Sequence, residues 1–406
     1  MADFHQNGVV ATLHNLTDRP VEELESLLVK YAKTKPMTLV LPSLFSELEG
    51  DALPHILDEL SKVEYLDHIV IGLDRANRDQ FIHAKEYFSR LPQKHSILWN
   101  DGPRLRAIDS KLAEKELAPP APGKGRNVWY CFGYILAALQ NTEVVGIHDC
   151  DIITYNRSML ARLMYPIANH NFSYIFSKGY YARVADGKMN GRVVRMLVTP
   201  FIKALRKVYG DDPYLEYLAA FRYPLAGEFA MSIDALQDLL IPNDWGLEIG
   251  ILSEIRRNYS TNVICQVEIA DIYDHKHQDV SNDDSSKGLS KMSIDIILSV
   301  FRKLATEGHT LSEDKLRAVK AAYLRTAMDM VEMYEHDALM NGLEYNVHRE
   351  ERTVELFARN IIEAGLNFMG NPIDPPFMPR WNRIRHAFPG IMDEIAEAVR
   401  LDAQEV

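Results

Sequence analysis

The chain has 406 residues, of which 47% are hydrophobic and 25% charged, the composition of a globular protein with a sizeable core. This length suits one large α/β domain with an appendage, or two modest domains. The formal net charge of −12 excludes a general nucleic-acid binder, which needs a broad basic surface. Anionic substrates would therefore need local Lys or Arg clusters, or a bound cation.

Neither the N-terminus nor the cysteines indicate export or membrane insertion. The first residues lack a basic segment followed by an apolar run, and the apolar stretch 132–139 is far shorter than the roughly 20 residues that cross a bilayer. Cys131, Cys150 and Cys265 are widely separated and predict neither a disulfide framework nor a CxxC zinc site. We therefore expect a soluble cytoplasmic protein.

The first hundred residues predict the start of a parallel sheet. Residues 37–41 and 68–73 are short apolar runs typical of buried strands, and the segment 51–62 between them has helical spacing. This order is a βαβ unit. A second helix over 78–91 leads to a third strand over 95–99.

The middle of the chain continues the alternation of helix and strand. Residues 115–125 are rich in Pro and Gly and predict a loop, a helix follows over 127–140, and a strand covers 143–148. That strand ends in His148-Asp149-Cys150-Asp151, and a further strand is expected over 262–269.

The pattern changes after residue 285. Residues 286–406 predict a helical C-terminal extension, separate from a catalytic domain over 1–285. Thr310 and Glu313 suggest a capping box before a long helix that reaches Met340. The tail has more apolar residues than a solvated appendage needs, which favours a homodimer. These residues are Met328, Met330, Val331, Met333 and Tyr334.

Asp149 and Asp151 are the first candidate site. Residues i and i+2 of an extended chain point to the same side, about 7 Å apart. The carboxyl end of a central strand is where open α/β sheets bind ligands. Two carboxylates there suit Mg²⁺ or Mn²⁺ carrying a diphosphate. The simpler interpretation is a strand that ends in a polar turn.

Two further segments are candidates for the same edge. His275 and His277 follow the strand over 262–269, and either would be a reasonable partner of an Asp on a cation, although such a pair is often surface decoration. Lys124, between Gly123 and Gly125, lies just before a helix N-terminus, a position that favours phosphate. On its own, that segment reads as a flexible turn.

The stretch 178–207 is the basic region best suited to an anionic acceptor. Within it, Arg192 and Arg195 follow Gly191 and are better candidates than the basic residues of a solvated helix face. Glu228 and Glu248 each place one carboxylate in an apolar, Gly-containing stretch, where a buried acid must be paired or functional. The basic residues of the stretch 178–207 are Lys178, Arg183, Lys188, Arg192, Arg195, Lys203, Arg206 and Lys207.

Seven short motifs in this order resemble the glucosyl-3-phosphoglycerate synthase family, retaining glycosyltransferases of the GT-A fold. The resemblance covers about residues 37–285 and implies a Rossmann-like, mostly parallel α/β sheet. It rests on Leu41-Pro42-Ser43-Leu44, Pro122-Gly-Lys-Gly125, Asp149-Cys-Asp151, Asn190-Gly-Arg-Val193, Pro224-Leu-Ala-Gly-Glu-Phe-Ala230, Gly246-Leu-Glu-Ile-Gly250 and His275-Lys-His277.

The resemblance implies a donor site for UDP-glucose. Asp151 would ligate Mg²⁺ or Mn²⁺ with His275, leaving His277 or Asp149 as alternative ligands. Lys124 would approach the uracil and phosphate end, and Asp149 would lie near the ribose. The residues implied at the nucleoside are Pro42, Ser43, Leu44 and Asp74, with Glu47 or Glu49 close by.

The resemblance also implies an acceptor site for 3-phosphoglycerate. Arg192, beside Gly191, matches the arginine that holds the acceptor phosphate, and Glu248 matches a carboxylate placed against the acceptor. Val194 departs from the family, which has a phosphate-binding Thr there, so either Arg195 compensates or the acceptor differs. We expect same-face attack by the acceptor hydroxyl, because no carboxylate stands out as a nucleophile.

Other functions remain open at this point. Glycerate, glycerol phosphate or another polyol acid would also fit as the acceptor. A sugar nucleotidyltransferase shares the sheet and acidic metal site, but the sequence lacks a convincing Gly-rich phosphate loop near its start. An inactive sugar-nucleotide-binding scaffold is disfavoured by the retained Asp149, Asp151 and His275, and a Rossmann dehydrogenase by the missing GxGxxG.

Overall fold

The computed structural model describes residues 6, 8–17, 19–275, 288–372 and 377–405. Its centre is one sheet of eight strands in the order β1-β10-β6-β9-β5-β2-β3-β4. Only β9 runs antiparallel to its neighbours in this sheet. The strands of the sheet are β1 (Ala11–Leu13), β2 (Met37–Leu44), β3 (Leu66–Asp74), β4 (Lys94–Trp99), β5 (Val144–Ile147), β6 (Phe176–Tyr181), β9 (Phe229–Ser232) and β10 (Ile264–Ala270). Strands β7 (Val184–Ala185) and β8 (Lys188–Met189) form a small separate hairpin.

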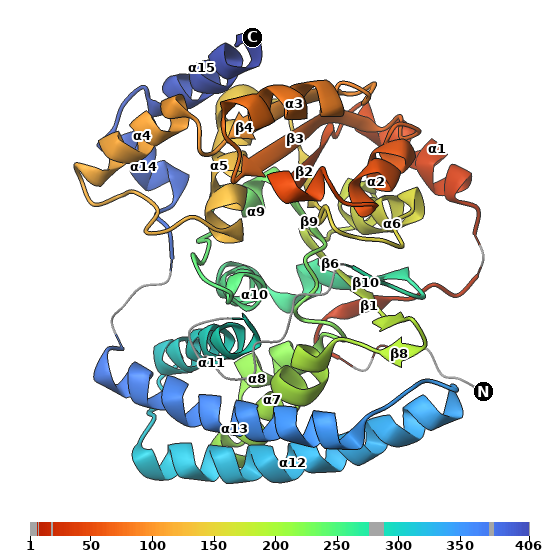
Figure 1. The fold of residues 1–406 in the computed structure, drawn as a ribbon, viewed down its shortest axis with the longest axis vertical. Coiled ribbons are helices and arrows are strands. Elements are labelled where there is room, and N and C mark those ends of the chain that lie inside the picture. Colours follow the sequence, from red (N-terminus) through yellow and green to blue (C-terminus); the bar gives the residue numbers. More distant parts are fainter. Residues whose placement is uncertain (1–5, 7, 18, 276–287, 373–376, 406) are drawn as a thin grey trace.

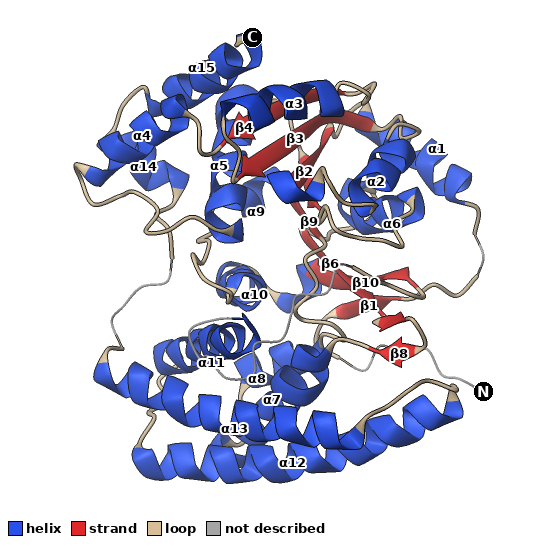
Figure 2. Cartoon of the chain, viewed as in Figure 1, coloured by secondary structure: helices blue, strands red, loops and turns tan. Residues whose placement is uncertain are grey.

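Helices cover both faces of this sheet, and Figure 2 shows the strands running through the molecule between them. The N-terminal helices are α1 (Val21–Ala32), α2 (Ala52–Leu60), α3 (Arg78–Phe88), α4 (Pro103–Ala113), α5 (Lys124–Ala138) and α6 (Arg157–Ala168). The middle of the chain adds α7 (Thr199–Tyr209), α8 (Pro213–Ala220), α9 (Ile233–Gln237) and α10 (Leu247–Asn258). The last helices are α11 (Gly288–Thr306), α12 (Glu313–Met340), α13 (Val347–Gly370), α14 (Trp381–Ala387) and α15 (Ile391–Gln404).

The apolar runs of the central strands build two cores, one on each face of the sheet. Leu39 and Leu41 of β2 lie in a core shared with α1, α2, α3 and α6, whereas Val40 lies in the core on the other face. This alternation follows from the two-residue period of a strand. Burial on both faces explains why these strands are apolar throughout, as parallel strands usually are. The mostly parallel α/β sheet expected from the sequence is confirmed.

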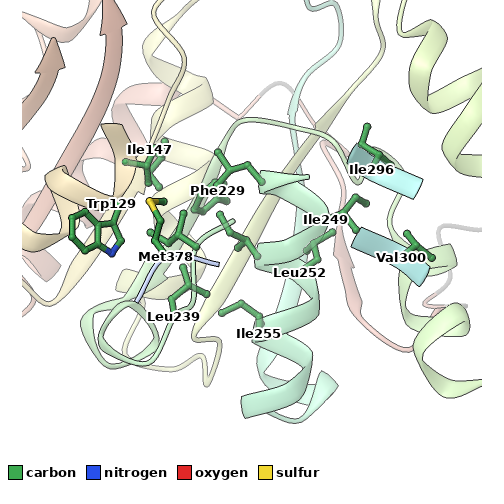
Figure 3. Packing of buried hydrophobic residues seen from close by; sticks show 14 of the residues in the cluster. Trp129, Ile147, Phe229, Leu239, Ile249, Leu252, Ile255, Ile296, Val300 and Met378 are labelled. Carbon is green, nitrogen blue, oxygen red and sulfur yellow. The ribbon is translucent and has the colours of Figure 1, made fainter. Parts of the chain in front are cut away.

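The C-terminal helices pack in two places. Helix α13 contacts both α11 and α12, and α12 lies along α7 (Figure 1). Figure 3 shows Ile296 and Val300 of α11 packed near Ile249 of α10, so these helices share a core with the sheet. The chain then returns, and α15 packs against α5, α4 and β4, which is an edge strand of the sheet.

Two tryptophan side chains hold α14 against α5, where the chain comes back to the sheet. Trp381 of α14 stacks on Trp129 of α5 with ring centroids 3.9 Å apart, and its indole N–H donates to the Trp129 carbonyl. Gly133 permits this approach, because a Cβ there would lie 2.2 Å from the Trp381 ring. The helical character predicted for the C-terminal region is confirmed for its described residues.

Two local predictions change in the structure. The capping box of Thr310 and Glu313 is wrong: Ser312 caps α12, its hydroxyl accepting from the Lys315 N–H, because the helix begins at Glu313. Helix α5 begins three residues earlier than expected, so Lys124 lies in its first turn. No helix in the described part of the chain is long and apolar enough to cross a bilayer.

The apolar cluster of α12 is largely covered by the chain itself. Met330 and Val331 are buried, and Met328 and Tyr334 pack against the core, whereas Met333 is exposed. The homodimer inferred from this cluster stays a prediction.

Candidate functional site

The candidate site lies where the central strands end. Strands β2, β3 and β5 are parallel neighbours, so their carboxyl ends meet at one edge of the sheet. Asp149 and Asp151 follow β5 directly, and His148 before them is fully buried. Burial lowers the pKa of the His148 imidazole to about 3, which keeps this ring neutral beneath the carboxylates.

His275 is brought to Asp151 by a short stretch of backbone pairing. The Ile153 N–H donates to the Asp274 carbonyl at 2.9 Å, and Ile152 forms an isolated antiparallel bridge with His275. As a result, the His275 Nδ1 lies 3.4 Å from the Asp151 Oδ2. His277 lies outside the described residues. The structure thus joins two of the expected ligands, which are 124 positions apart in the sequence.

The chemistry of this pair suits a hard divalent cation. A carboxylate oxygen and an imidazole nitrogen are both accepted by Mn²⁺, and the carboxylate by Mg²⁺. Within the described residues, no group of three or more His, Cys, Asp or Glu side chains forms a metal site. Protein side chains in the described residues would thus supply only part of a coordination shell, and oxygens of a bound diphosphate are suited to complete it.

Lys124 joins two carboxylates from different elements. Its Nζ lies 2.7 Å from the Asp149 Oδ1 and 3.3 Å from the Glu248 Oε1, where Glu248 is in the first turn of α10. Burial by itself lowers the pKa of the Lys124 ammonium, but the attraction of Asp149 and Glu248 more than offsets it, so the pKa is raised. For Asp149, burial by itself raises the pKa of the carboxyl group, but the attraction of Lys124 more than offsets it, so the pKa is lowered. The cluster therefore holds one positive and two negative charges.

Close approach of the backbone completes this cluster. A Cβ on Gly227 would lie 2.3 Å from the Asp149 Oδ2 and 3.0 Å from the Lys124 Nζ. A Cβ on Gly125 would lie 2.3 Å from the Pro242 carbonyl oxygen. The two motifs that contain these glycines therefore form one packed unit with the Asp149 carboxylate.

Glu228 lies behind the cluster in a cage that the sequence did not indicate. Its carboxylate is fully buried and accepts hydrogen bonds from the Tyr181 and Tyr273 hydroxyls, both at 2.8 Å. Burial, then repulsion from Asp149, raises the pKa of Glu228. The tyrosines stack at 3.7 Å between centroids, yet they stand 92 positions apart with no shared motif. No local signal identifies them, because only the tertiary structure brings their hydroxyls together.

Lys178, one of the basic residues assigned to the acceptor region, is buried and donates to the Ala226 carbonyl at 2.5 Å. Burial lowers the pKa of Lys178 to about 8. This lysine therefore supports the backbone before Gly227 and is not presented on the surface.

The residues expected at the nucleoside gather at the ends of β2 and β3. Leu44 and Asp74 are opposite each other in the register of these strands, and Ser43 is buried one position earlier. Asp74 accepts from the Asn100 side chain at 2.8 Å, and burial raises its pKa. Pro42 lies two positions before the end of β2, Glu47 ends the short 3₁₀ turn after this strand, and Glu49 is exposed beyond that turn.

The arginines expected at the acceptor follow β8 at the start of a helical segment: Asn190 and Gly191 turn the chain, Arg192 is helical, and Arg195 lies in the π-helical turn Val194–Val198 that leads into α7. Residues 190–195 are called the acceptor loop below. Gly191 has φ +71°, and a Cβ there would lie 3.3 Å from Arg183. Arg192 faces Glu350 of α13, with Nε 3.2 Å from Oε1, and its side chain is 20% exposed. Arg195 is buried and donates to the Asn190 and Met189 carbonyls. Arg192 is thus the more accessible of the two.

A line of aromatic contacts connects this loop to the acidic cluster. Arg183, whose carbonyl accepts from the Asn190 N–H, donates to the Tyr223 hydroxyl and lies over the Tyr273 ring. Tyr223 packs on Tyr181, with ring centroids 5.0 Å apart. The loop and the cluster around Asp149 therefore share one packed framework.

A mostly parallel sheet with an Asp–His pair and a helix-start lysine at its carboxyl edge defines a metal-dependent glycosyltransferase of the GT-A class. The chain is 42% identical to a glucosyl-3-phosphoglycerate synthase of Persephonella marina over 402 residues, 99% of each chain. It is 38% identical to that of Methanococcoides burtonii over 411 residues, 99% of this chain and 98% of the relative. The chain belongs to the glucosyl-3-phosphoglycerate synthase family.

Solved structures agree with this fold. The glucosyl-3-phosphoglycerate synthase of Mycobacterium tuberculosis in complex with Mn²⁺, UDP-glucose and phosphoglyceric acid matches with a TM-score of 0.54 and 21% identity. The match covers 73% of this chain and 88% of that chain. No family model matches the chain.

Proposed function

We propose that this protein transfers glucose from UDP-glucose to 3-phosphoglycerate with retention, giving glucosyl-3-phosphoglycerate. The observation that carries the proposal is the Asp151–His275 pair beside the cluster of Lys124, Asp149 and Glu248 at the carboxyl edge of the sheet. The full-length relatives are named for this synthase activity. The mycobacterial relative was solved with the donor and acceptor of this reaction bound.

On the donor side, Asp151 and His275 would hold Mg²⁺ or Mn²⁺, with Asp149 or His277 as alternative ligands. When bound, such a cation neutralises the charge that develops on the departing diphosphate. Lys124 would hold the phosphate and uracil end from the start of α5, and Asp149 would lie near the ribose. The nucleoside contacts would come from Pro42, Ser43, Leu44, Glu47 and Asp74.

On the acceptor side, Arg192 beside Gly191 would bind the phosphate, and Glu248 would lie against the rest of the acceptor. The burial of Val194 and Arg195 supports Arg192 as the main phosphate ligand of this loop. Arg195 would contribute by shaping this segment, through its hydrogen bonds to the carbonyls of Asn190 and of Met189 at the end of β8.

The environment of Glu228 supports same-face attack by the acceptor hydroxyl. A double-displacement route needs a carboxylate free to attack the sugar. Both Glu228 oxygens accept tyrosine hydrogen bonds, and Asp149 and Glu248 are paired with Lys124. The leaving phosphate oxygen would then take the proton of the acceptor hydroxyl, which accounts for retention without an enzyme nucleophile.

We also propose that the protein acts in the cytoplasm as a homodimer. The three cysteines are free and buried, which suits a reducing compartment. The last turns of α12 expose Met333, Leu339 and Met340, apolar side chains that a second copy would cover.

The test is UDP release on mixing the protein with Mg²⁺, UDP-glucose and 3-phosphoglycerate, with no-acceptor and chelator controls. Acceptor-dependent and chelator-sensitive release is the expected result. Glycerate and glycerol 3-phosphate belong in the same panel, since the mycobacterial relative was also solved with glycerol 3-phosphate. Equal rates with and without 3-phosphoglycerate would refute the acceptor, and pyrophosphate formation from UTP and glucose 1-phosphate would favour a nucleotidyltransferase.

A further inference from the structure

Glu350 is a buried carboxylate outside the sheet that contacts the acceptor loop. It lies in the first turns of α13 with only 5% of its surface exposed. A buried carboxylate needs charged or hydrogen-bonding partners. Its oxygens face Arg192 at 3.2 Å and Arg195 at 3.6 Å. The partners therefore come from a loop about 155 positions earlier in the chain.

The contact to Arg192 uses one side of the guanidinium. Arg192 donates to Glu350 through Nε, and no Nη hydrogen bond or ion pair of Arg192 is found among the described residues. A guanidinium is a rigid planar fork, so fixing Nε also fixes where both Nη groups point. The Arg192 side chain is 20% exposed, and neither of its Nη atoms is among the buried nitrogens without a partner, so the free side of the fork meets solvent. This is the arrangement of an arginine held from behind to receive an anion in front.

Neighbouring contacts hold the rest of the loop from the same direction. Arg195 lies over the rings of Tyr334 and Tyr345, with its Cζ 5.0 Å and 5.8 Å from their centroids. The Glu344 N–H donates to the Gly187 carbonyl at 2.7 Å. The β7–β8 hairpin and the acceptor loop are therefore held by residues 334–350, which span the end of α12, the connection to α13 and the first turn of α13.

We propose that Glu350 is a positioning residue that orients Arg192 toward the acceptor's phosphate, so that α13 completes the acceptor site. The inference rests on the proposed function. Two arginines and one carboxylate leave this cluster with a net positive charge, as binding of a phosphate requires. Without the Glu350 charge, Arg192 loses its partner and turns among several rotamers, which weakens acceptor binding before any effect on the chemical step.

A different role for Glu350 would change the KM for the acceptor in the opposite direction. If the Glu350 carboxylate occupied the place of the acceptor phosphate, removing its charge would strengthen acceptor binding. The two cases are separated by the KM for 3-phosphoglycerate alone.

The experiment compares Glu350→Gln with Glu351→Gln. Glu351 is the next residue of the same helix, makes no ion pair with either arginine, and loses the same charge on substitution. We expect Glu350→Gln to raise the KM for 3-phosphoglycerate about tenfold, the effect of one misplaced charge-assisted hydrogen bond. The KM for UDP-glucose and kcat should stay within about twofold, a split that general destabilisation would not produce. Glu351→Gln should match the wild type.

A double variant checks that the effect passes through Arg192. Arg192→Gln should raise the acceptor KM, and adding Glu350→Gln should raise it little further, because both changes remove one interaction. If Glu350→Gln does not fold, Glu350→Asp decides instead: it keeps the charge but shortens the reach, and should also raise the acceptor KM selectively.

The outcomes separate this inference from the proposed function. A wild-type protein without acceptor-dependent UDP release would refute the proposed function. If the wild-type protein shows acceptor-dependent turnover but the Glu350→Gln variant has an unchanged or lowered KM for 3-phosphoglycerate, the positioning role is overturned and the proposed function stands. Additive effects in the double variant would also overturn it.

Discussion

Gly227→Ala tests the packing of the acidic cluster most directly. Gly227 does not adopt a positive φ, so alanine fits its backbone and only the added methyl group acts. That Cβ would lie 2.3 Å from the Asp149 Oδ2, whereas ordinary contact begins near 3.4 Å, so the carboxylate must move by about 1 Å. The Lys124 Nζ, 3.0 Å from the same point, must yield as well.

A shift of this size should be visible in the kinetics. A displacement of about 1 Å in a catalytic arrangement lowers the rate on the order of 100-fold. The assay is acceptor-dependent UDP release at saturating Mg²⁺, read as kcat/KM for UDP-glucose. We expect the thermal midpoint to change little, because the cluster lies at the edge of the core.

Gly370→Ala is the matched control. Gly370 ends α13, and a Cβ there meets nothing within 4 Å, so activity should match the wild type. A Gly227→Ala protein with wild-type kcat/KM would refute the reasoning, since it would mean that the Lys124–Asp149 geometry does not matter for turnover.

Two further predictions concern the metal pair and the returning helices. Asp151→Ala should lower turnover more than about 100-fold without changing the circular dichroism spectrum, because it removes the carboxylate facing His275. The control is Asp211→Ala, at an exposed carboxylate. Near-wild-type activity of the Asp151 variant with Mg²⁺ would refute the metal role. Trp381→Ala should lower the free energy of unfolding by about 3–5 kcal/mol, because the buried ring stacks on Trp129. Denaturant unfolding measures this loss, and a similar loss in half-exposed Trp245→Ala would show that the assay does not report the stacking.

Much of the catalytic edge was predictable from local sequence. The runs at 37–41, 68–73 and 143–148 were expected as strands and are confirmed: the first two are parts of β2 and β3, and the third contains β5. Strands buried on both faces are apolar throughout, so a short window of sequence identifies them. The Asp149-Cys-Asp151 motif follows the last of these strands, and the parallel topology then dictates that it lies at the carboxyl edge.

Helix ends were predicted less well. Thr310 and Glu313 have the spacing of a capping box, yet Ser312 caps α12. Several polar residues near a helix start satisfy the pattern equally, and packing of the first turn selects among them. The early start of α5 has a similar cause, since Lys124 gains two carboxylate partners by joining the helix.

The sequence by itself determined five of the eight strands of the sheet, the acidic motif and the family resemblance, because short local segments of the chain carry each of these signals. It did not indicate β1, β6 or β9. Only the tertiary structure decided that Tyr181 and Tyr273 enclose Glu228 and that Glu350 holds Arg192. Those partners are separated by tens to more than a hundred positions. Their pairing is driven by the need to satisfy buried charges, which no local periodicity records.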